Sequence, residues 1–174
     1  MRKTMKFRVV IALSLALVML FTLAGPALAG PPSREYQKYG GHYYKAFVTQ
    51  GDIVNWAEAV SLSETKNYFD TKTGINYVGH LVTISSNADN GFVYRKFIKS
   101  SSVSCWIGLS KGESGAWAWV THEPVEYTNW APGYPVSNST YDFAMMNYQG
   151  GGWLNYPATP YELGYVVEYE QPTT

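Results

Sequence analysis

The chain lacks a second cysteine, because Cys105 is the only one among its 174 residues. A single cysteine cannot close an internal disulfide, so packing alone must hold the core together. Cys105 lies beside Trp106 in an apolar segment, which favours a buried, inert thiol over a reactive one. Six tryptophans and 15 tyrosines can supply that core, since each aromatic side chain buries a large area.

The chain also has little positive charge once its N-terminus is set apart. It contains 13 basic and 13 acidic residues, but four of the basic ones lie within the first eight positions. The remainder carries nine basic against 13 acidic residues, a net charge of −4, and no run of Lys or Arg. A weakly acidic domain is a poor match for nucleic acid or for an anionic membrane surface, so we expect neither partner.

Residues 1–29 have the three parts of a secretory signal peptide: the early positive charges, a mostly apolar run at 11–23 and the small-residue motif Ala27-Leu28-Ala29. The alternative is a membrane anchor. The apolar run is shorter than the ~20 residues that a spanning helix needs, and Pro26 follows it. The sequence therefore predicts a secreted or extracellular protein with no membrane span after the signal is removed.

Patterns typical of catalysis or of metal binding are missing. His42, His80 and His122 are far apart, and none has a second His four residues on or a Cys pair nearby, so no zinc motif is expected. No Gly-x-Ser-x-Gly elbow is present. The sequence does not exclude a Ser-His-Asp triad, because its members need not be neighbours in sequence. The cluster at 150–152 is not followed by the Lys-Ser/Thr of a phosphate loop. We expect no enzyme.

What the chain does have is a regular order of helix and strand patterns. Ile53, Trp56, Ala57 and Val60 are spaced as one face of a helix, which predicts a helix over 52–63. A capping pattern of Ser86 followed by Asp89 predicts a second helix that runs to about residue 98. Strands are predicted at 41–48, in a hairpin at 68–69 and 75–77, and at 80–84, 103–109, 116–120 and 164–170.

Residues 123–156 are predicted to be mostly loop. The segment is rich in Gly, Pro, Asn and Ser, and a short strand around Met145 is left open. A loop of this length is usually functional or disordered, and its two tryptophans and several tyrosines argue against disorder. We therefore interpret it as the functional part of the chain.

In this order, the motifs resemble a C-type lectin-like domain over about residues 42–170. Trp106-Ile107-Gly108-Leu109 matches the best-known family signature, and 79–92 is similar to the family's strand and second-helix entry. The resemblance implies an α+β fold, with two helices packed on antiparallel sheets and a long loop region. It leaves residues 30–41 as an N-terminal leader and 171–174 as a tail.

The cysteines depart from the family pattern. Members often carry two disulfides, and Ser63, Val167, Phe143 and Ala158 stand where the resemblance places those four cysteines. Simpler secreted members, including bacterial ones, often lack the disulfides, so the resemblance is to a disulfide-free secreted form as seen in bacteria.

The calcium ligands depart as well. Sugar-binding members hold Ca²⁺ with a Glu-Pro-Asn or Gln-Pro-Asp triplet, a nearby acid and a Trp-Asn-Asp motif. The matching positions here read Tyr134-Pro135-Val136, Tyr141 with Asp142 beside it, and Trp153-Leu154-Asn155. Ca²⁺ takes six to eight oxygen ligands, several of them carboxylates. Because Asp142 is the only carboxylate, the resemblance implies no cofactor and calcium-independent binding; Ca²⁺ held by backbone carbonyls stays open.

The loop aromatics predict a binding surface in place of the calcium site. Aromatic faces stack on sugar rings and also anchor protein interfaces. Trp130 and Trp153 are expected to close the loop onto the core, and Tyr134 and Tyr141 to be exposed. The predicted ligand-binding residues are Tyr134, Asn138, Tyr141, Asp142, Asn155 and Tyr156.

Three functions follow from these observations. The first is a secreted C-type lectin-like module that recognises a carbohydrate or an extracellular protein through the long loop. The second is an adhesion or protein-interaction module without sugar binding. The third and weakest is a secreted enzyme that uses His122 or Asp142.

Overall fold

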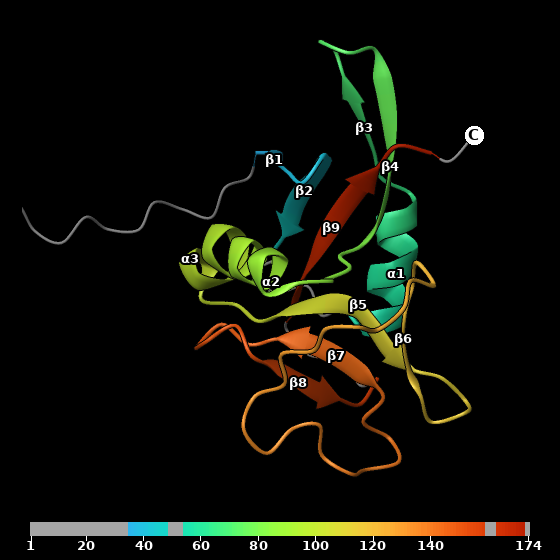
Figure 1. The fold of residues 1–174 in the computed structure, drawn as a ribbon, viewed down its shortest axis with the longest axis vertical. Coiled ribbons are helices and arrows are strands. Elements are labelled where there is room, and N and C mark those ends of the chain that lie inside the picture. The colour runs from blue at the N-terminus through green and yellow to red at the C-terminus, as the bar shows by residue number, and fades with distance from the viewer. Residues whose placement is uncertain (1–34, 49–53, 159–162, 173–174) are drawn as a thin grey trace, which may run out of the picture.

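A computed structural model describes residues 35–48, 54–158 and 163–172 (Figure 1). The predicted signal peptide at 1–29 lies outside the described residues, as does the start of the predicted leader. Within the described ranges, every helix is too short or too polar to cross a membrane.

Five antiparallel strands form the upper part of the molecule as drawn in Figure 1, in the order β1-β2-β9-β4-β3. They are β1 (Gln37–Tyr39), β2 (His42–Phe47), β9 (Gly164–Glu170), β4 (Ile75–Leu81) and β3 (Asn67–Asp70). Strand β2 contains two tyrosines and β9 contains two tyrosines and two valines, and both residue types favour strands.

Two predictions in this part need correction. The leader expected at 30–41 joins the sheet from residue 37, because β1 pairs with β2 through a turn at Gly40 and Gly41, both with positive φ. The separate strands expected at 75–77 and 80–84 are one strand, β4, because Val78 and Gly79 continue the ladder to β9.

Four further strands form the lower part: β5 (Cys105–Lys111), β6 (Trp117–Trp119), β7 (Phe143–Met146) and β8 (Trp153–Tyr156). Strand β5 pairs antiparallel with β6 and β7, and β7 pairs with β8. Strand β9 joins the two parts, because its first residues pair in parallel with β5. The sheet is therefore mixed.

The segment 123–156 contains more strand than expected. Alternating small and large apolar residues, Ala144 and Met146, are buried in β7, and β8 pairs with its full length. The long loop therefore ends at Asp142, and it lies next to the hairpin of β7 and β8 (Figure 1).

Two helical segments cover the sheet, as predicted, and each packs over a different hydrophobic cluster. Helix α1 (Trp56–Glu64) begins at Asn55, whose side chain and Glu58 form a reciprocal capping box. The second segment is continuous through α2 (Asn87–Val93), the π-helical turn η1 (Tyr94–Ile98) and α3 (Lys99–Ser101). Ser86 caps it by accepting a hydrogen bond from the Asp89 backbone N–H, so the predicted start is confirmed.

Strand β5 is buried on both of its faces over residues 105–109. Cys105, Ile107 and Leu109 pack into the cluster beneath α2, whereas Trp106 points into the cluster beneath α1. The Trp106 indole N–H donates to the Val54 carbonyl at 2.8 Å. Burial between two clusters explains why this strand reads as a continuous apolar run.

Two of the four positions matched to family cysteines meet at Gly79. An added Cβ at Gly79 would lie 2.7 Å from the Ser63 carbonyl oxygen and 2.9 Å from Val167 Cγ1. The Ser63 hydroxyl is instead satisfied by the Ala59 carbonyl at 2.6 Å. Close packing therefore connects α1 to β9 at the positions where many family members have a disulfide.

We expect Gly79→Ala to lower the free energy of unfolding by about 1–3 kcal/mol, because the new methyl group meets backbone atoms that cannot rotate away. Gly150→Ala is the matched control, since nothing lies within 4 Å of its added Cβ. Urea unfolding followed by tryptophan fluorescence measures both. Equal stability of the two variants would contradict the packing argument.

We also expect the Cys105 thiol to be inert in the folded protein. Burial raises its pKa to about 12, so the reactive thiolate does not form near neutral pH. Ellman's reagent at pH 8 should label the native chain negligibly and label one thiol per chain after denaturation in guanidinium. Rapid labelling of the native chain would contradict the buried placement.

Candidate functional site

The long loop is fastened to the core by Trp153. Its indole N–H donates to the Asn90 side chain on α2 at 2.8 Å. Its backbone N–H donates to the Asn129 carbonyl at 2.7 Å, and its carbonyl accepts from Ala131 N–H at 2.9 Å. The fully buried ring therefore ties three parts of the chain together, and the prediction that Trp153 is a core residue is confirmed.

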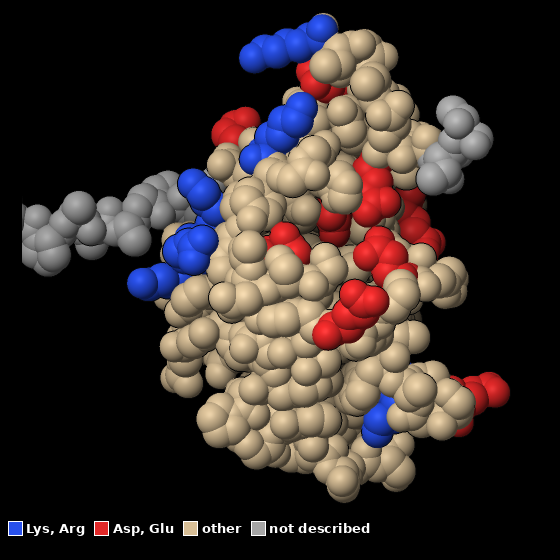
Figure 2. Space-filling model, in the orientation of Figure 1, with Lys and Arg blue, Asp and Glu red and all other residues tan. Residues whose placement is uncertain are grey.

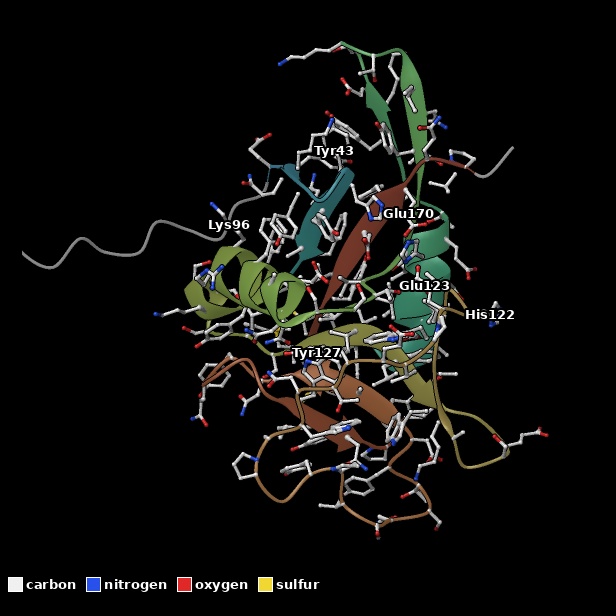
Figure 3. All side chains as sticks on the ribbon, in the orientation of Figure 1. Tyr43, Lys96, His122, Glu123, Tyr127 and Glu170 are labelled. Atoms are coloured by element: carbon white, nitrogen blue, oxygen red, sulfur yellow. The ribbon has the colours of Figure 1, made fainter. Side chains whose placement is uncertain are left out.

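Other aromatic rings pack around Trp153. Tyr127 and Trp119 approach it edge-on, and Trp130 lies 5.8 Å from it and 4.8 Å from Trp117, centroid to centroid. Trp130 is half-buried against the core, so it closes the loop as expected. Figure 3 shows Tyr127 between α2 and the β7–β8 hairpin.

Asn155 holds the middle of the loop on β8. Its side-chain oxygen accepts from Val136 N–H at 2.8 Å, and its amide donates to the carbonyls of Val136 at 3.0 Å and Tyr141 at 2.9 Å. The side chain is fully buried. Asn155 was predicted to contact a ligand; the structure corrects this to a positioning role, because its polar atoms are already used inside the loop.

The tyrosines predicted for the site lie on the segment that Asn155 holds or beside it. Tyr141 and Tyr156 bring their rings to 6.0 Å, tilted by 40°. Tyr134 precedes a cis peptide bond to Pro135. All three are partly exposed, so Tyr134 and Tyr141 are less open than the sequence analysis expected.

The two polar residues predicted beside them differ in surroundings. Asn138 is exposed at the loop tip, and its side-chain oxygen accepts from the N–H and the hydroxyl of Thr140. Asp142 is partly buried at the start of β7, with its carboxylate 3.6 Å from Lys111 Nζ. Lys111 also lies 5.5 Å from the centre of the Trp117 ring, which fixes the cation beside Asp142.

This donor set does not fit Ca²⁺. At the matched positions Asp142 is the one carboxylate, and a lysine already neutralises it. The Asn155 oxygen, the other candidate, is taken by a backbone N–H. A hard cation that requires six to eight oxygens would find too few free donors at these positions.

A shallow cavity lies on the other side of the loop and was not anticipated. Trp130, Asn129, Asn147 and Gln149 are among its lining residues, and its volume is about 340 Å³. Planar amides beside an indole can bind sugar hydroxyls. The sequence offered no signal, because the lining comes from two segments that the backbone bonds of Trp153 to Asn129 and Ala131 bring together.

The structure also gathers charged residues on the upper sheet. His42, Glu168 and Glu170 bring one ligand atom each to within 4.8 Å of one another, and His80 Nε2 lies 3.3 Å from Glu170 Oε1. The pKa of His42 is raised, chiefly by its hydrogen bond to Glu168. Burial acts to lower the pKa of His80, but the two glutamates raise it overall.

Acidic side chains gather along one flank of the face shown in Figure 2, whereas most lysines and arginines lie along the other. The sequence analysis did not bring the two histidines and two glutamates together, because they come from three separate strands.

The mixed sheet, the two helical segments and the fastened loop define a C-type lectin fold. The solved structure of the C-type lectin CEL-I from Cucumaria echinata matches with a TM-score of 0.64 at 24% identity, covering 82% of this chain and 99% of that one. A calcium-independent type II antifreeze protein matches with a TM-score of 0.61 at 20% identity, covering 81% and 95%.

The family is shown by sequence as well. The model of the lectin C-type domain matches residues 72–163, more than half of the chain. The chain therefore belongs to the C-type lectin domain family.

Two relatives illustrate the range of this family. Lectin BRA-3 of Megabalanus rosa is 27% identical over 133 residues, 76% of this chain and 73% of that protein. The 30 kDa spicule matrix protein of Hemicentrotus pulcherrimus is 46% identical over 54 residues, 29% of this chain, and the match spans only 18% of that protein's length. These relatives are animal proteins, so they do not support the association with bacterial members.

We expect Asn155→Ala to lower the free energy of unfolding by about 1–3 kcal/mol, because it leaves buried backbone groups of the loop without partners. It should also speed proteolytic cleavage between residues 134 and 141. Asn138→Ala is the matched control and should change stability by less than about 0.5 kcal/mol, since its side chain is exposed. Unchanged cleavage in Asn155→Ala would show that Asn155 does not hold the loop.

Proposed function

We propose that this protein is an extracellular lectin that binds a glycan through its long loop without calcium. It is a C-type lectin domain, and the members of this family are binding proteins rather than enzymes. The observation that carries the proposal is the pair of partly exposed rings, Tyr141 and Tyr156, beside the loop segment that Asn155 holds.

The chemistry of this surface suits a sugar ring. The C–H face of a pyranose packs against an aromatic ring, and two tilted rings about 6 Å apart offer adjoining platforms. Asp142 and Asn138 lie on the same loop segment and can accept and donate hydrogen bonds to hydroxyl groups. Because the loop is already braced, binding would order few additional side chains, which favours affinity.

Calcium independence is supported by the brace itself. Asn155 links β8 to the backbone of Val136 and of Tyr141, a connection that a bridging ion could also make. The Asp142–Lys111 pair leaves little net negative charge to attract a cation. The solved antifreeze protein described as calcium-independent indicates that this fold can exist without the ion.

Secretion is supported by the predicted signal peptide and by relatives named as a lectin and as a spicule matrix protein. The latter name also favours the alternative of a matrix or adhesion module whose loop contacts a protein. The enzyme alternative has weaker support, because Asp142 faces Lys111 while His122 is exposed and points away from the molecule (Figure 3).

The test is a glycan array probed with the purified protein in Ca²⁺ and again in EDTA. We expect binding to a limited set of glycans that is equal in both conditions. Tyr134→Ala combined with Tyr141→Ala should weaken it by at least about tenfold, because the loss of an aromatic anchor typically costs more than 1 kcal/mol. Phe69→Ala, an aromatic residue 58% exposed on the distant β3–β4 hairpin, is the control and should leave binding unchanged.

Three outcomes would change the assignment. Binding that disappears in EDTA would contradict calcium independence. Binding lost in Gln149→Ala but kept in the double tyrosine variant would move the site to the amide-lined cavity. An absence of glycan binding in both conditions would favour the protein-partner alternative, which a pull-down with extracellular proteins then tests.

A further inference from the structure

A second candidate site lies on the strands of the upper sheet, apart from the β7–β8 hairpin in Figure 1, with Glu123 at the start of the long loop lining its pocket. Register places its members on one face. Glu168 of β9 pairs with Tyr44 of β2 on one side and with His80 of β4 on the other, and His42 is two positions from Tyr44. Because side chains alternate along a strand, His42, His80, Glu168 and Glu170 all project to the same side.

The ligand atoms of His42, Glu168 and Glu170 lie within 4.8 Å of one another, and His80 approaches this group through Glu170. His42 Nδ1 lies 2.6 Å from Glu168 Oε1 and 3.8 Å from Glu170 Oε1, and His80 Nε2 lies 3.3 Å from Glu170 Oε1. Four ligands at about 2.0–2.1 Å from a tetrahedral Zn²⁺ would be about 3.3 Å apart. Two of the measured separations are near this value, and the third widens once the shared proton is replaced by an ion.

His80 provides an independent indication. Its Nδ1 is 2.8 Å from the backbone carbonyl of Leu81, so Nδ1 carries a proton and donates it there. In the neutral ring, Nε2 then presents a lone pair toward the Glu170 carboxylate. Nε2 is buried and makes no aligned hydrogen bond. Metal-binding histidines are typically held in this manner, with the second ring nitrogen donating to a backbone carbonyl.

The surroundings favour a cation. The cluster opens into a pocket of about 160 Å³ lined by four carboxylates, those of Asp89, Glu123, Glu168 and Glu170, and by no lysine or arginine among the described residues. Figure 3 shows Glu123 and Glu170 on this side of the molecule. Glu168 is almost fully buried without a permanently charged cationic partner in that lining. A bound divalent ion would neutralise this charge.

Neighbouring groups already orient Glu168 as a ligand. Its Oε1 accepts from the Tyr44 hydroxyl at 2.7 Å, and its Oε2 accepts from Thr83 N–H at 3.0 Å. Both bonds can persist when a lone pair of Oε1 binds a metal, because a carboxylate oxygen has more than one acceptor direction. The carboxylate is therefore fixed in place before an ion arrives.

We propose that His42, His80, Glu168 and Glu170 bind one divalent transition-metal ion, with Zn²⁺ as the best fit. Two imidazoles and two carboxylates favour such an ion over Ca²⁺, which prefers a larger set of oxygens. The ion takes the place of the proton shared by His42 and Glu168, so binding releases protons. It joins β2, β4 and β9, and it is independent of the glycan proposal because it uses no residue of the long loop.

The test is a Zn²⁺ titration of the purified, metal-stripped protein at pH 7.5 in competition with a chromophoric chelator. We expect one ion per chain and a higher Tm in Zn²⁺, whereas excess Ca²⁺ should not displace the ion. His80→Gln and His42→Gln should each weaken binding by at least roughly tenfold, since even residues that only orient a ligand contribute about 10–100-fold. His122→Gln is the matched control and should bind normally.

Co²⁺ provides a second measurement, because tetrahedral nitrogen and oxygen ligation should give visible absorption that His80→Gln removes. Near-UV circular dichroism verifies that each variant is folded; if His80→Gln is not folded, His42→Gln decides, because its side chain is 40% exposed. The proposal is overturned by an absence of saturable Zn²⁺ binding, by unaltered affinity in the folded variants, or by an equal loss in His122→Gln.

Discussion

The short parallel contact between β5 and β9 is the constraint on which the rest of the structure depends. It consists of two residue pairs, Cys105 with Gly164 and Trp106 with Tyr165. An added Cβ at Gly164 would lie 2.9 Å from Cys105 Sγ and equally close to the Phe47 carbonyl oxygen, so the strands meet at this distance only because the glycine has no side chain. Cys105 lies in the cluster beneath α2, and Trp106 and Tyr165 lie in the cluster beneath α1, so this junction sets where both clusters and both helical segments lie.

Close packing elsewhere in the domain explains how it can hold together with one buried cysteine. Helix α1 packs so closely on Gly79 that a methyl group has no room. Trp153 links the loop, the hairpin and α2, because its indole N–H, its backbone N–H and its carbonyl all form hydrogen bonds. Close contacts and fully satisfied polar groups thus replace covalent links. The contacts that hold the loop are made by a few buried side chains, among them Trp153 and Asn155.

The elements that sequence predicted well are those with a local signal. The capping residue Ser86 and the signature around Trp106 depend on neighbours in the chain, and they occur as the patterns indicated. Asn55 was expected inside the helix over 52–63, but it is the N-cap of α1. Asn155 shows where such reasoning ended: its residue type suggested a ligand contact, but its partners, Val136 and Tyr141, are brought to it by the fold. His42 and His80 are neighbours only because β9 lies between their strands, and no spacing rule could reveal that.

The arrangement of the chain ends has a consequence for how the domain could be displayed. Strand β1, the first described element, and the end of β9 both lie in the upper part of the molecule, whereas the long loop projects from the opposite end (Figure 1). Any support joined through either end would therefore leave the loop pointing outward, unobstructed by its own attachment. Under the proposed glycan binding, several copies fixed side by side would present several loops to one surface, and weak individual contacts would then add up by avidity.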